Sequence, residues 1–241
     1  MRGAIVLIAA ALWEGLARMA GRGALVPPPS AIVAGLTAIF SDRGVVVALV
    51  WAMIELVVAF ALSVVIGCLI GFLIAARAST ERLALPVVLL LYAIPQVTIL
   101  PLFILYFGLG APCKIAFGVS HGVFPVALST IAGLKDAKPH HLRWADSLGA
   151  SRWRRFRRLL LPQAAPALCT GMRLAMSTTL LGVLLAELYV SSSGVGFYTQ
   201  LFTDSSQGGK LFALVFTVAA IAIALTGAMR IVERRVMRWR G

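Results

Sequence analysis

Six long apolar stretches alternate with shorter polar stretches along the chain. A helix needs about 20 mainly apolar residues to cross a hydrocarbon core of about 30 Å. The stretches cover roughly residues 3 to 20, 45 to 75, 83 to 107, 113 to 133, 165 to 190 and 210 to 230. The pattern predicts an all-α polytopic membrane protein with six transmembrane helices, forming a single domain over residues 1–241.

Prolines and glycines add local detail to this pattern. The third stretch contains three prolines and is therefore expected to be bent or interrupted: Pro86, Pro95 and Pro101. The prolines at 27–29 exclude a helix there, and Ser30 is expected to cap a short interfacial helix that ends near Phe40. Gly67 and Gly71 lie four residues apart in the second stretch and predict close packing against another helix.

Composition and charge exclude a soluble domain and fix an orientation. Hydrophobic residues make up 60% of the chain and charged residues only 13%, against about 25% charged in soluble domains. The net charge is +13, which in a membrane protein reflects basic cytoplasmic segments and not a nucleic-acid partner. With the N-terminus in the cytoplasm, sixteen Lys and Arg lie on the cytoplasmic side, and the opposite side keeps Arg18, Arg22, Arg43, Lys114 and Lys210. Both termini are therefore predicted to be cytoplasmic.

The loop from about 134 to 162 is densely basic and patterned. His140 to Leu148 is expected to form a short helix that Gly149 ends, and Ser151 is expected to cap a second helix that runs to Leu161 before Pro162. On this second helix an apolar face opposes a basic one: Trp153, Phe156 and Leu160 against Arg154, Arg155 and Arg158. Such a helix lies along an anionic membrane surface or docks a cytoplasmic protein.

The spacing in this loop resembles a known family signature. Counted from Gly149, Leu159 is at position ten and Leu161-Pro162 are at positions twelve and thirteen. Binding-protein-dependent ABC importer permeases carry Glu-Ala-Ala, three residues, Gly, nine residues, Ile, one residue and Leu-Pro. The chain departs from this signature where the Glu and the first Ala fall, at Arg143 and Trp144. The nitrate, sulfonate and taurine branch is the most similar, through Ala93-Ile94-Pro95, Phe107-Gly108, Ala186-Glu187 and Gly194-Val195-Gly196.

The resemblance implies a type I permease of the bacterial cytoplasmic (inner) membrane. In that family a helix before the signature Gly inserts into a groove of an ATP-binding subunit. The implied docking residues are His141, Leu142, Arg143, Trp144, Ala145, Asp146, Ser147, Leu148 and Gly149. The implied partners are a cytoplasmic ATP-binding subunit dimer, a second permease copy in a homodimer, an extracytoplasmic solute-binding protein and the lipid bilayer.

The chain itself carries no sign of energy-coupling or catalytic chemistry. It lacks the phosphate-binding loop Gly, four residues, Gly-Lys-Ser/Thr, so ATP and Mg²⁺ are expected to bind the partner ATPase. Its three cysteines are scattered without metal-ligand spacing and predict packing residues: Cys68, Cys113 and Cys169. We therefore expect a transport subunit with no cofactor, no metal and no catalytic residues.

Polar groups that are costly in lipid suggest a pathway. Glu55 and Glu187 lie within spans and either line a vestibule or make interhelical contacts, while Tyr92 and Gln96 flank Pro95 in the interrupted span. No basic residue falls in the middle third of any span. This weakens the case for nitrate and favours a small organic solute such as a sulfonate, or a partly aromatic or zwitterionic one. Nitrate and a pyrimidine or aromatic vitamin precursor remain as alternatives.

Two other classes of protein remain to be weighed. One is an ion-coupled carrier, which needs no ATPase. The other is an intramembrane enzyme that uses Glu55, Glu187 and His121 as acid and base, although the chain has no paired catalytic spacing.

Overall fold

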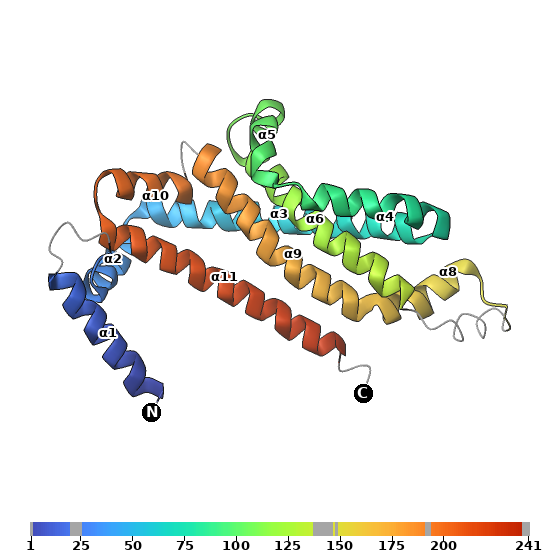
Figure 1. Ribbon diagram of the computed structural model, residues 1–241, viewed down its shortest axis with the longest axis horizontal. Helices are drawn as coiled ribbons and strands as arrows, with labels where there is room; N and C mark the ends of the chain where they lie inside the picture. The colour runs from blue at the N-terminus through green and yellow to red at the C-terminus, as the bar shows by residue number, and fades with distance from the viewer. Residues whose placement is uncertain (1, 20–25, 137–146, 148, 191–193, 238–241) are drawn as a thin grey trace. The chain divides into compact units, whose positions relative to one another are not determined.

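The computed structural model describes residues 2–19, 26–136, 147, 149–190 and 194–237, and these residues form helices and no strand (Figure 1). This confirms the predicted all-α class. The helices are α1 (Arg2–Met19), α2 (Pro29–Ser41), α3 (Arg43–Ala75), α4 (Ala78–Ala93), the 3-10 helix η1 (Gln96–Ile99), α5 (Leu100–Phe107), α6 (Ala111–Lys135), α8 (Arg152–Arg155), the π-helix η2 (Phe156–Leu160), α9 (Leu161–Val190), α10 (Val195–Asp204) and α11 (Gly208–Met237).

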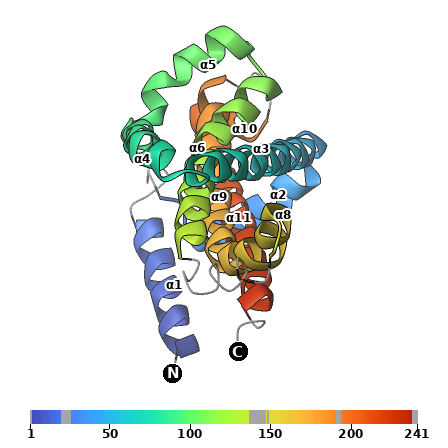
Figure 2. The same cartoon turned by 90° about the vertical axis from the view of Figure 1, so that its right-hand side faces the viewer.

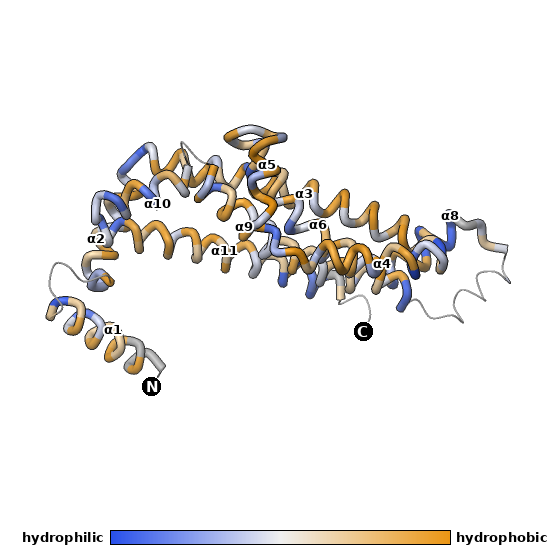
Figure 3. Tube along the Cα trace, turned by 45° about the horizontal axis from the view of Figure 1, so that its top comes forward, coloured by the Kyte–Doolittle hydropathy of each residue, from blue (hydrophilic) through white to orange (hydrophobic). Residues whose placement is uncertain are grey.

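Several of these helices are long and apolar enough to cross a membrane. Within the described residues there are four, namely Arg43–Ala75, Ala111–Lys135, Trp153–Val190 and Gly208–Arg235, and a fifth if α4 and the segment Gln96–Phe107 are one bent span. Figure 3 shows nearly continuous apolar colouring along α3 and α11 and a polar α8. The structure therefore supports a polytopic membrane protein without confirming the count of six spans.

The chain divides into two compact units. The first unit comprises Met1–Ile54 and Glu187–Ile223, and the second comprises Glu55–Ala186 and Ala224–Gly241. The core of the first unit joins α2, the start of α3, α10 and the start of α11 through Ile39, Val45, Phe202 and Leu214. Gly209 lets α11 approach α2 closely, because a Cβ there would lie 2.7 Å from the Ala31 carbonyl oxygen.

A seam of small residues organises the second unit. Along α3 and α6 the residues in contact recur at four-residue intervals: Glu55, Ala59, Ser63, Gly67 and Gly71 face Lys114, Gly118, Gly122, Val126 and Thr130. A Cβ at Gly67 would lie 2.7 Å from Val126 Cβ, and one at Gly71 would lie 2.5 Å from Thr130 Cβ. The packing role predicted for the two glycines is confirmed. We call this set the small-residue seam.

Helix α9 packs against the same seam. A Cβ added at Gly118 would lie 2.6 Å from a methyl carbon of Val183 on α9. Farther along α6, a Cβ at Gly133 would lie 2.8 Å from Ala167 Cβ. Small residues therefore bring three membrane helices to backbone contact distance, as expected where no hydrophobic effect drives helices together in lipid.

The third predicted span is interrupted, as expected. Its two parts, α4 and the segment from Gln96 to Phe107, are bent by 83°, and Figure 2 shows the change of direction between α4 and α5. Pro95 is the N-cap of η1, whereas Pro86 lies inside α4 and Pro101 lies in the first turn of α5. Only one of the three prolines therefore marks the break.

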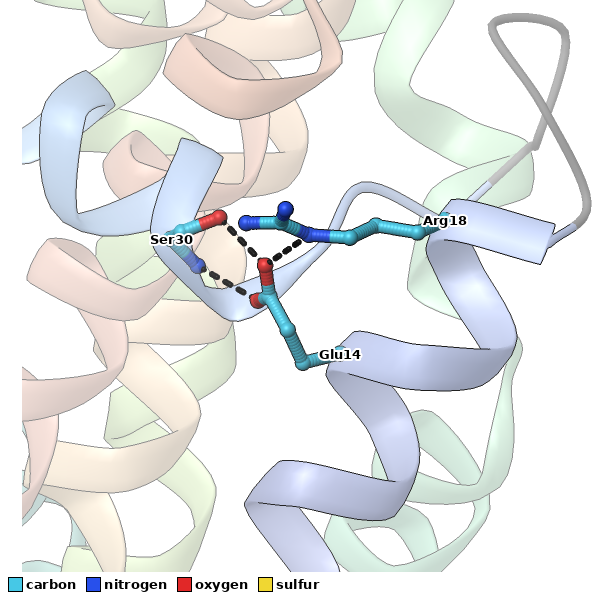
Figure 4. Close-up of polar contacts among 3 residues, drawn as sticks. All are labelled: Glu14, Arg18 and Ser30. Atoms are coloured by element: carbon cyan, nitrogen blue, oxygen red, sulfur yellow. Dashed lines mark hydrogen bonds and ion pairs between the residues drawn. The ribbon is translucent and has the colours of Figure 1, made fainter.

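The start of α2 differs from the prediction. Pro28 is the N-cap, and Ser30 lies inside the first turn, so Ser30 does not cap the helix. Because Pro29 has no N–H, the Ser30 N–H is the first donor that needs an acceptor. It donates to Glu14 Oε2 at 3.0 Å, and the Ser30 hydroxyl donates to Glu14 Oε1 at 2.7 Å (Figure 4). The cap thus comes from α1, on a carboxylate that Arg18 also contacts at 2.6 Å.

The helix after Ser151 also differs from the prediction. It does not end before Pro162: α8, the π-helix η2 and α9 follow one another without a gap from Arg152 to Val190. A proline ring clashes with the carbonyl one turn earlier in an α-helix. The wider π turn just before Pro162 changes that turn and lets the helix continue.

Candidate functional site

A buried ion pair lies at one end of the small-residue seam. Lys114 Nζ lies 2.9 Å from Glu55 Oε1, and the two side chains are 6% and 5% exposed. Glu55 Oε2 is buried and has no hydrogen-bond partner among the described residues. Charges removed from water on this scale are costly unless they are paired, so the pair ties the first turn of α6 to α3.

The sequence predicted only half of this pair. Glu55 was a pathway candidate with an interhelical contact as the other interpretation, and the structure places it in such a contact. Lys114 was assigned to the outer side of the membrane as one basic residue among five. Its proximity to Glu55 depends on the packing of two helices about 60 residues apart in sequence, which the hydrophobic pattern does not encode.

Glu187 lies at the end of α9 and fixes the turn into α10. Its side chain is among the most deeply buried, and Oε1 accepts a hydrogen bond from the Val195 N–H at 3.0 Å. Gly194 precedes α10 with φ 115°, a conformation that favours glycine. A Cβ at Gly196 would lie 2.5 Å from the Glu187 carbonyl carbon. The glycine pair thus lets the chain fold back onto Glu187.

The interrupted span is held to α6 by the other pathway candidates. Gln96 Nε2 donates to the Ser120 carbonyl oxygen at 3.2 Å, and the Ser120 hydroxyl donates to Gln96 Oε1 at 3.0 Å. The Tyr92 ring centroid lies 5.5 Å from that of Phe124. Pro95 is exposed. Gln96 therefore uses both ends of its amide on one residue of α6.

Helix α6 provides partners for the pathway candidates Glu55, Gln96 and Tyr92. Lys114 pairs with Glu55, Ser120 with Gln96, and Phe124 with Tyr92. These three partners were not singled out by the sequence as pathway residues. Glu187 belongs to the first unit. Within the second unit, Glu55, Tyr92 and Gln96 come from three different elements and all contact residues of α6.

The predicted docking helix falls largely outside the described residues. This applies to 141–146 and to Leu148, whereas Ser147 is helical. Gly149 has φ 65°, the left-handed conformation expected of a residue that ends a helix. Ser151 caps the next helix as predicted, because its hydroxyl oxygen accepts the Arg154 N–H at 3.4 Å.

The segment after Ser151 contacts α3. The Phe156 ring packs edge-on against Phe72 with centroids 5.2 Å apart. Trp153 stacks on Phe156 at 5.8 Å and is 68% exposed. The contact between Phe72 and Phe156 therefore joins the basic segment to α3, and the exposed Trp153 ring offers an apolar surface to a membrane or a protein.

These features define a class, a multi-pass helical membrane protein with a basic, patterned loop. Residues 63–238 match the family described as the binding-protein-dependent transport system inner membrane component, and the chain belongs to this family. This confirms the ABC importer permease resemblance. It makes the chain a transport permease of the inner membrane and replaces the carrier and enzyme interpretations.

Relatives in this family are named for different solutes. The chain is 28% identical over 229 residues to the formylaminopyrimidine transport permease protein ThiX of Halalkalibacterium halodurans, covering 95% of this chain and 91% of that protein. It is 28% identical over 221 residues to the taurine transport system permease protein TauC of Escherichia coli, covering 90% and 80%. It is 21% identical over 197 residues to the nitrate import permease protein NrtB of Leptolyngbya laminosa, covering 82% and 71%.

Proposed function

We propose that the chain is the permease subunit of an ATP-driven importer and forms the translocation pathway for a small organic solute such as a sulfonate. The family match over residues 63–238 carries this proposal, because it covers the predicted docking loop and four of the five pathway candidates. A solute-binding protein delivers the solute from outside. A separate cytoplasmic ATPase dimer binds ATP and Mg²⁺ and supplies the energy.

The loop of about 134–162 is the proposed docking element, with residues 141–149 in the ATPase groove. Two observations support it. Gly149 adopts the conformation that ends a helix, and the helix after Ser151 reaches α3 through Phe156 and Phe72. Movement of a docked helix would thus be transmitted to α3 and, because the helix continues past Pro162, to α9. A bias between two pathway states needs differential contacts of only a few kcal/mol.

Two further features of the proposed assembly are the side of the membrane on which the termini lie and the number of permease copies. The basic residues favour both termini in the cytoplasm. We also propose a homodimer of permeases, because the resemblance to ABC importer permeases implies two permease copies around one pathway.

The solute is proposed from the more similar relatives. Those named for taurine and formylaminopyrimidine, both organic, are each 28% identical, and the one named for nitrate is 21% identical. A pyrimidine vitamin precursor is the second candidate, because Tyr92 is 42% exposed beside the break at Pro95 and offers a ring for stacking.

Copurification tests the proposed function. The tagged chain is expressed with the ATPase and binding protein encoded beside it and solubilised in detergent. We expect the ATPase to copurify with the wild type and to be lost from the double variant Leu148→Glu/Gly149→Asp, which remains inserted. Leu109→Glu places the same change in an exposed residue of the α5–α6 loop and should retain the ATPase. Retention of the ATPase and of full uptake by the double variant would refute docking through this loop.

A further inference from the structure

The C-terminal end of α11 carries three exposed arginines: Arg230, Arg234 and Arg235. Glu233 lies among them, and α9 occupies both of its carboxylate oxygens, through the Arg173 guanidinium at 2.9 Å and the Thr170 hydroxyl at 2.8 Å. Within the described part of the chain, Arg234 and Arg235 make no ion pair. Their two positive charges are therefore available to an anion.

The length of α11 places these arginines at the level of the lipid headgroups. No charged residue lies between Lys210 and Arg230, and the residues from 211 to 229 reach about 28 Å at 1.5 Å per residue. This length matches a hydrocarbon core about 30 Å thick. Arg230 therefore lies at the edge of the core. Arg234 follows one turn later and lies about 6 Å farther out, at the depth of the lipid phosphates.

An open hollow beside these arginines is lined by both basic and apolar side chains. Its volume is about 500 Å³, and its walls among the described residues are Ile231, Arg234, Arg235 and Met237. Ile231 and Met237 are 58% and 45% exposed. One turn closer to the membrane centre, a Cβ added at Gly227 meets nothing within 4 Å. The end of α11 thus offers guanidinium groups at phosphate depth with open apolar surface next to them.

We propose that this end of α11 binds one anionic phospholipid. Arg234 and Arg235 hold its phosphate, because the planar guanidinium group forms paired hydrogen bonds to phosphate oxygens. Ile231 and Met237 contact its glycerol backbone and the first carbons of its acyl chains. The bound lipid fixes the depth of α11 in the membrane next to the contact between Glu233 and α9. Such a site is independent of the solute and of the ATPase.

Charge and chemistry favour a phospholipid over the other occupants. In a two-fold contact between copies of the chain the same patch meets itself, so the arginines of the two copies would face and repel each other. A free phosphate ion would bind the arginines and leave the apolar walls of the hollow uncovered. Basic groups just beyond the end of a membrane span attract anionic lipids, and a phospholipid also covers the apolar walls.

A lipid titration tests the proposal. The full chain is purified in detergent together with any subunits that copurify. Bound dioleoylphosphatidylglycerol and dioleoylphosphatidylcholine are then counted by native mass spectrometry. We expect the wild type to bind its first phosphatidylglycerol about tenfold more tightly than phosphatidylcholine, which has no net charge. Arg234→Gln/Arg235→Gln should lose this difference and bind the two lipids equally, and wild-type preference in this variant would overturn the site.

Matched variants separate the site from an effect of net charge. Arg77→Gln/Arg82→Gln removes two other exposed arginines and should keep the preference of the wild type. Arg234→Lys/Arg235→Lys retains both charges and should keep most of the affinity for phosphatidylglycerol. An equal loss of preference in the two glutamine variants would assign the effect to net charge and overturn the proposal.

Two further measurements distinguish a phospholipid from other occupants. Glycerophosphate carries the phosphate without acyl chains and should not displace phosphatidylglycerol at an equal concentration. Displacement at that concentration would make the hollow a site for free phosphate groups and overturn the lipid. Loss of the copurifying ATPase from Arg234→Gln/Arg235→Gln, with lipid binding unchanged, would place the arginines at a protein interface and also overturn the proposal.

Discussion

Gly122 is a residue at which the packing of three helices can be tested. A Cβ added there would collide with Thr179 Oγ1 of α9 and lie 2.8 Å from Ser63 Cβ of α3. Gly122→Ala should therefore destabilise the protein by about 1–3 kcal/mol, since overpacking a close contact forces backbone shifts. The midpoint of thermal unfolding in detergent, followed by size-exclusion chromatography, measures the effect.

The matched control substitution should change the stability of the protein in the opposite direction. Gly227 lies in α11, and a Cβ there meets nothing within 4 Å. Gly227→Ala removes only the backbone freedom of glycine and should stabilise the protein by up to about 1 kcal/mol. Equal unfolding midpoints for the two alanine variants would contradict the close packing of the three helices at Gly122.

At the scale of single residues, the sequence predicted the role of some residues but not the residues that they contact. Gly67 and Gly71 were recognisable because small residues four apart on an apolar helix have few other uses. Gly118 and Gly122 have the same spacing but were not singled out. The burial of Lys114 was not predicted, because a lysine near the end of an apolar run ordinarily extends to water. Its burial depends on Glu55, which the local pattern does not contain.

At the scale of elements, α9 and α11 are joined by a polar clasp in the second unit. Arg173 Nε lies 2.9 Å from Glu233 Oε2, and the Thr170 hydroxyl donates to Glu233 Oε1 at 2.8 Å. The arginine and glutamate side chains are 27% and 13% exposed. The clasp thus holds the two helices together where α11 approaches its C-terminal, basic end.

Removing the carboxylate should loosen this clasp. Glu233→Ala leaves Arg173 without its carboxylate partner and should lower the unfolding midpoint by about 2–4 °C, the shift that corresponds to about 1 kcal/mol in a chain of this size. The exchanged variant Arg173→Glu/Glu233→Arg should recover most of the loss. A double-mutant cycle with no coupling between the two positions would show that the contact is not energetically significant.

The contact between η2 and α3 should transmit force. Phe156→Ala removes the ring that packs against Phe72, so ATPase copurification should persist while uptake falls about fivefold or more, because docking would no longer be rigidly connected to the seam. Phe156→Leu keeps apolar bulk and should be intermediate. Loss of copurification in the alanine variant would instead make Phe156 part of the docking surface.

The ends of helices were predicted correctly from the sequence where one residue alone determines the backbone conformation. Helix α4 ends at Ala93 because the residue before a proline is disfavoured in the α conformation, and Ile94 is extended. The 3-10 turn after Pro95 is then anchored by Gln96 on Ser120. Pro162 was expected to end a helix and does not, because the preceding π turn accommodates its ring. A π turn depends on how the chain packs around it and has no clear sequence pattern.

For the whole molecule, the open question is the number of membrane crossings, and parity decides it. Both termini lie on one side only if the number of spans is even. Within the described residues, four helices are long and apolar enough to span, or five if the bent pair is one span. The basic residues favour both termini in the cytoplasm. If the bent pair is one span, we therefore predict that α1 is the sixth.

Helix α1 can cross the membrane because its length is sufficient and its polar residues are paired. Its 18 residues reach about 27 Å at 1.5 Å per residue, close to the thickness of the hydrocarbon core. Glu14 and Arg18 neutralise each other one turn apart, and Ser30 satisfies the carboxylate further, which lowers the cost of placing them near the outer interface.

Fluorescent-protein fusions test the sixth span, because green fluorescent protein exported unfolded does not fluoresce. A fusion at the N-terminus should fluoresce if α1 crosses the membrane and remain dark if the chain has only five spans. A fusion at the C-terminus should fluoresce in both cases. A fusion truncated after Asp42 contains only α1 and α2, so it should be dark if α1 crosses the membrane and should fluoresce if α1 does not cross. A dark N-terminal fusion beside a bright C-terminal one would place α1 outside the bilayer and reverse the inferred position of the N-terminus, while leaving the five later crossings and the cytoplasmic docking loop unchanged.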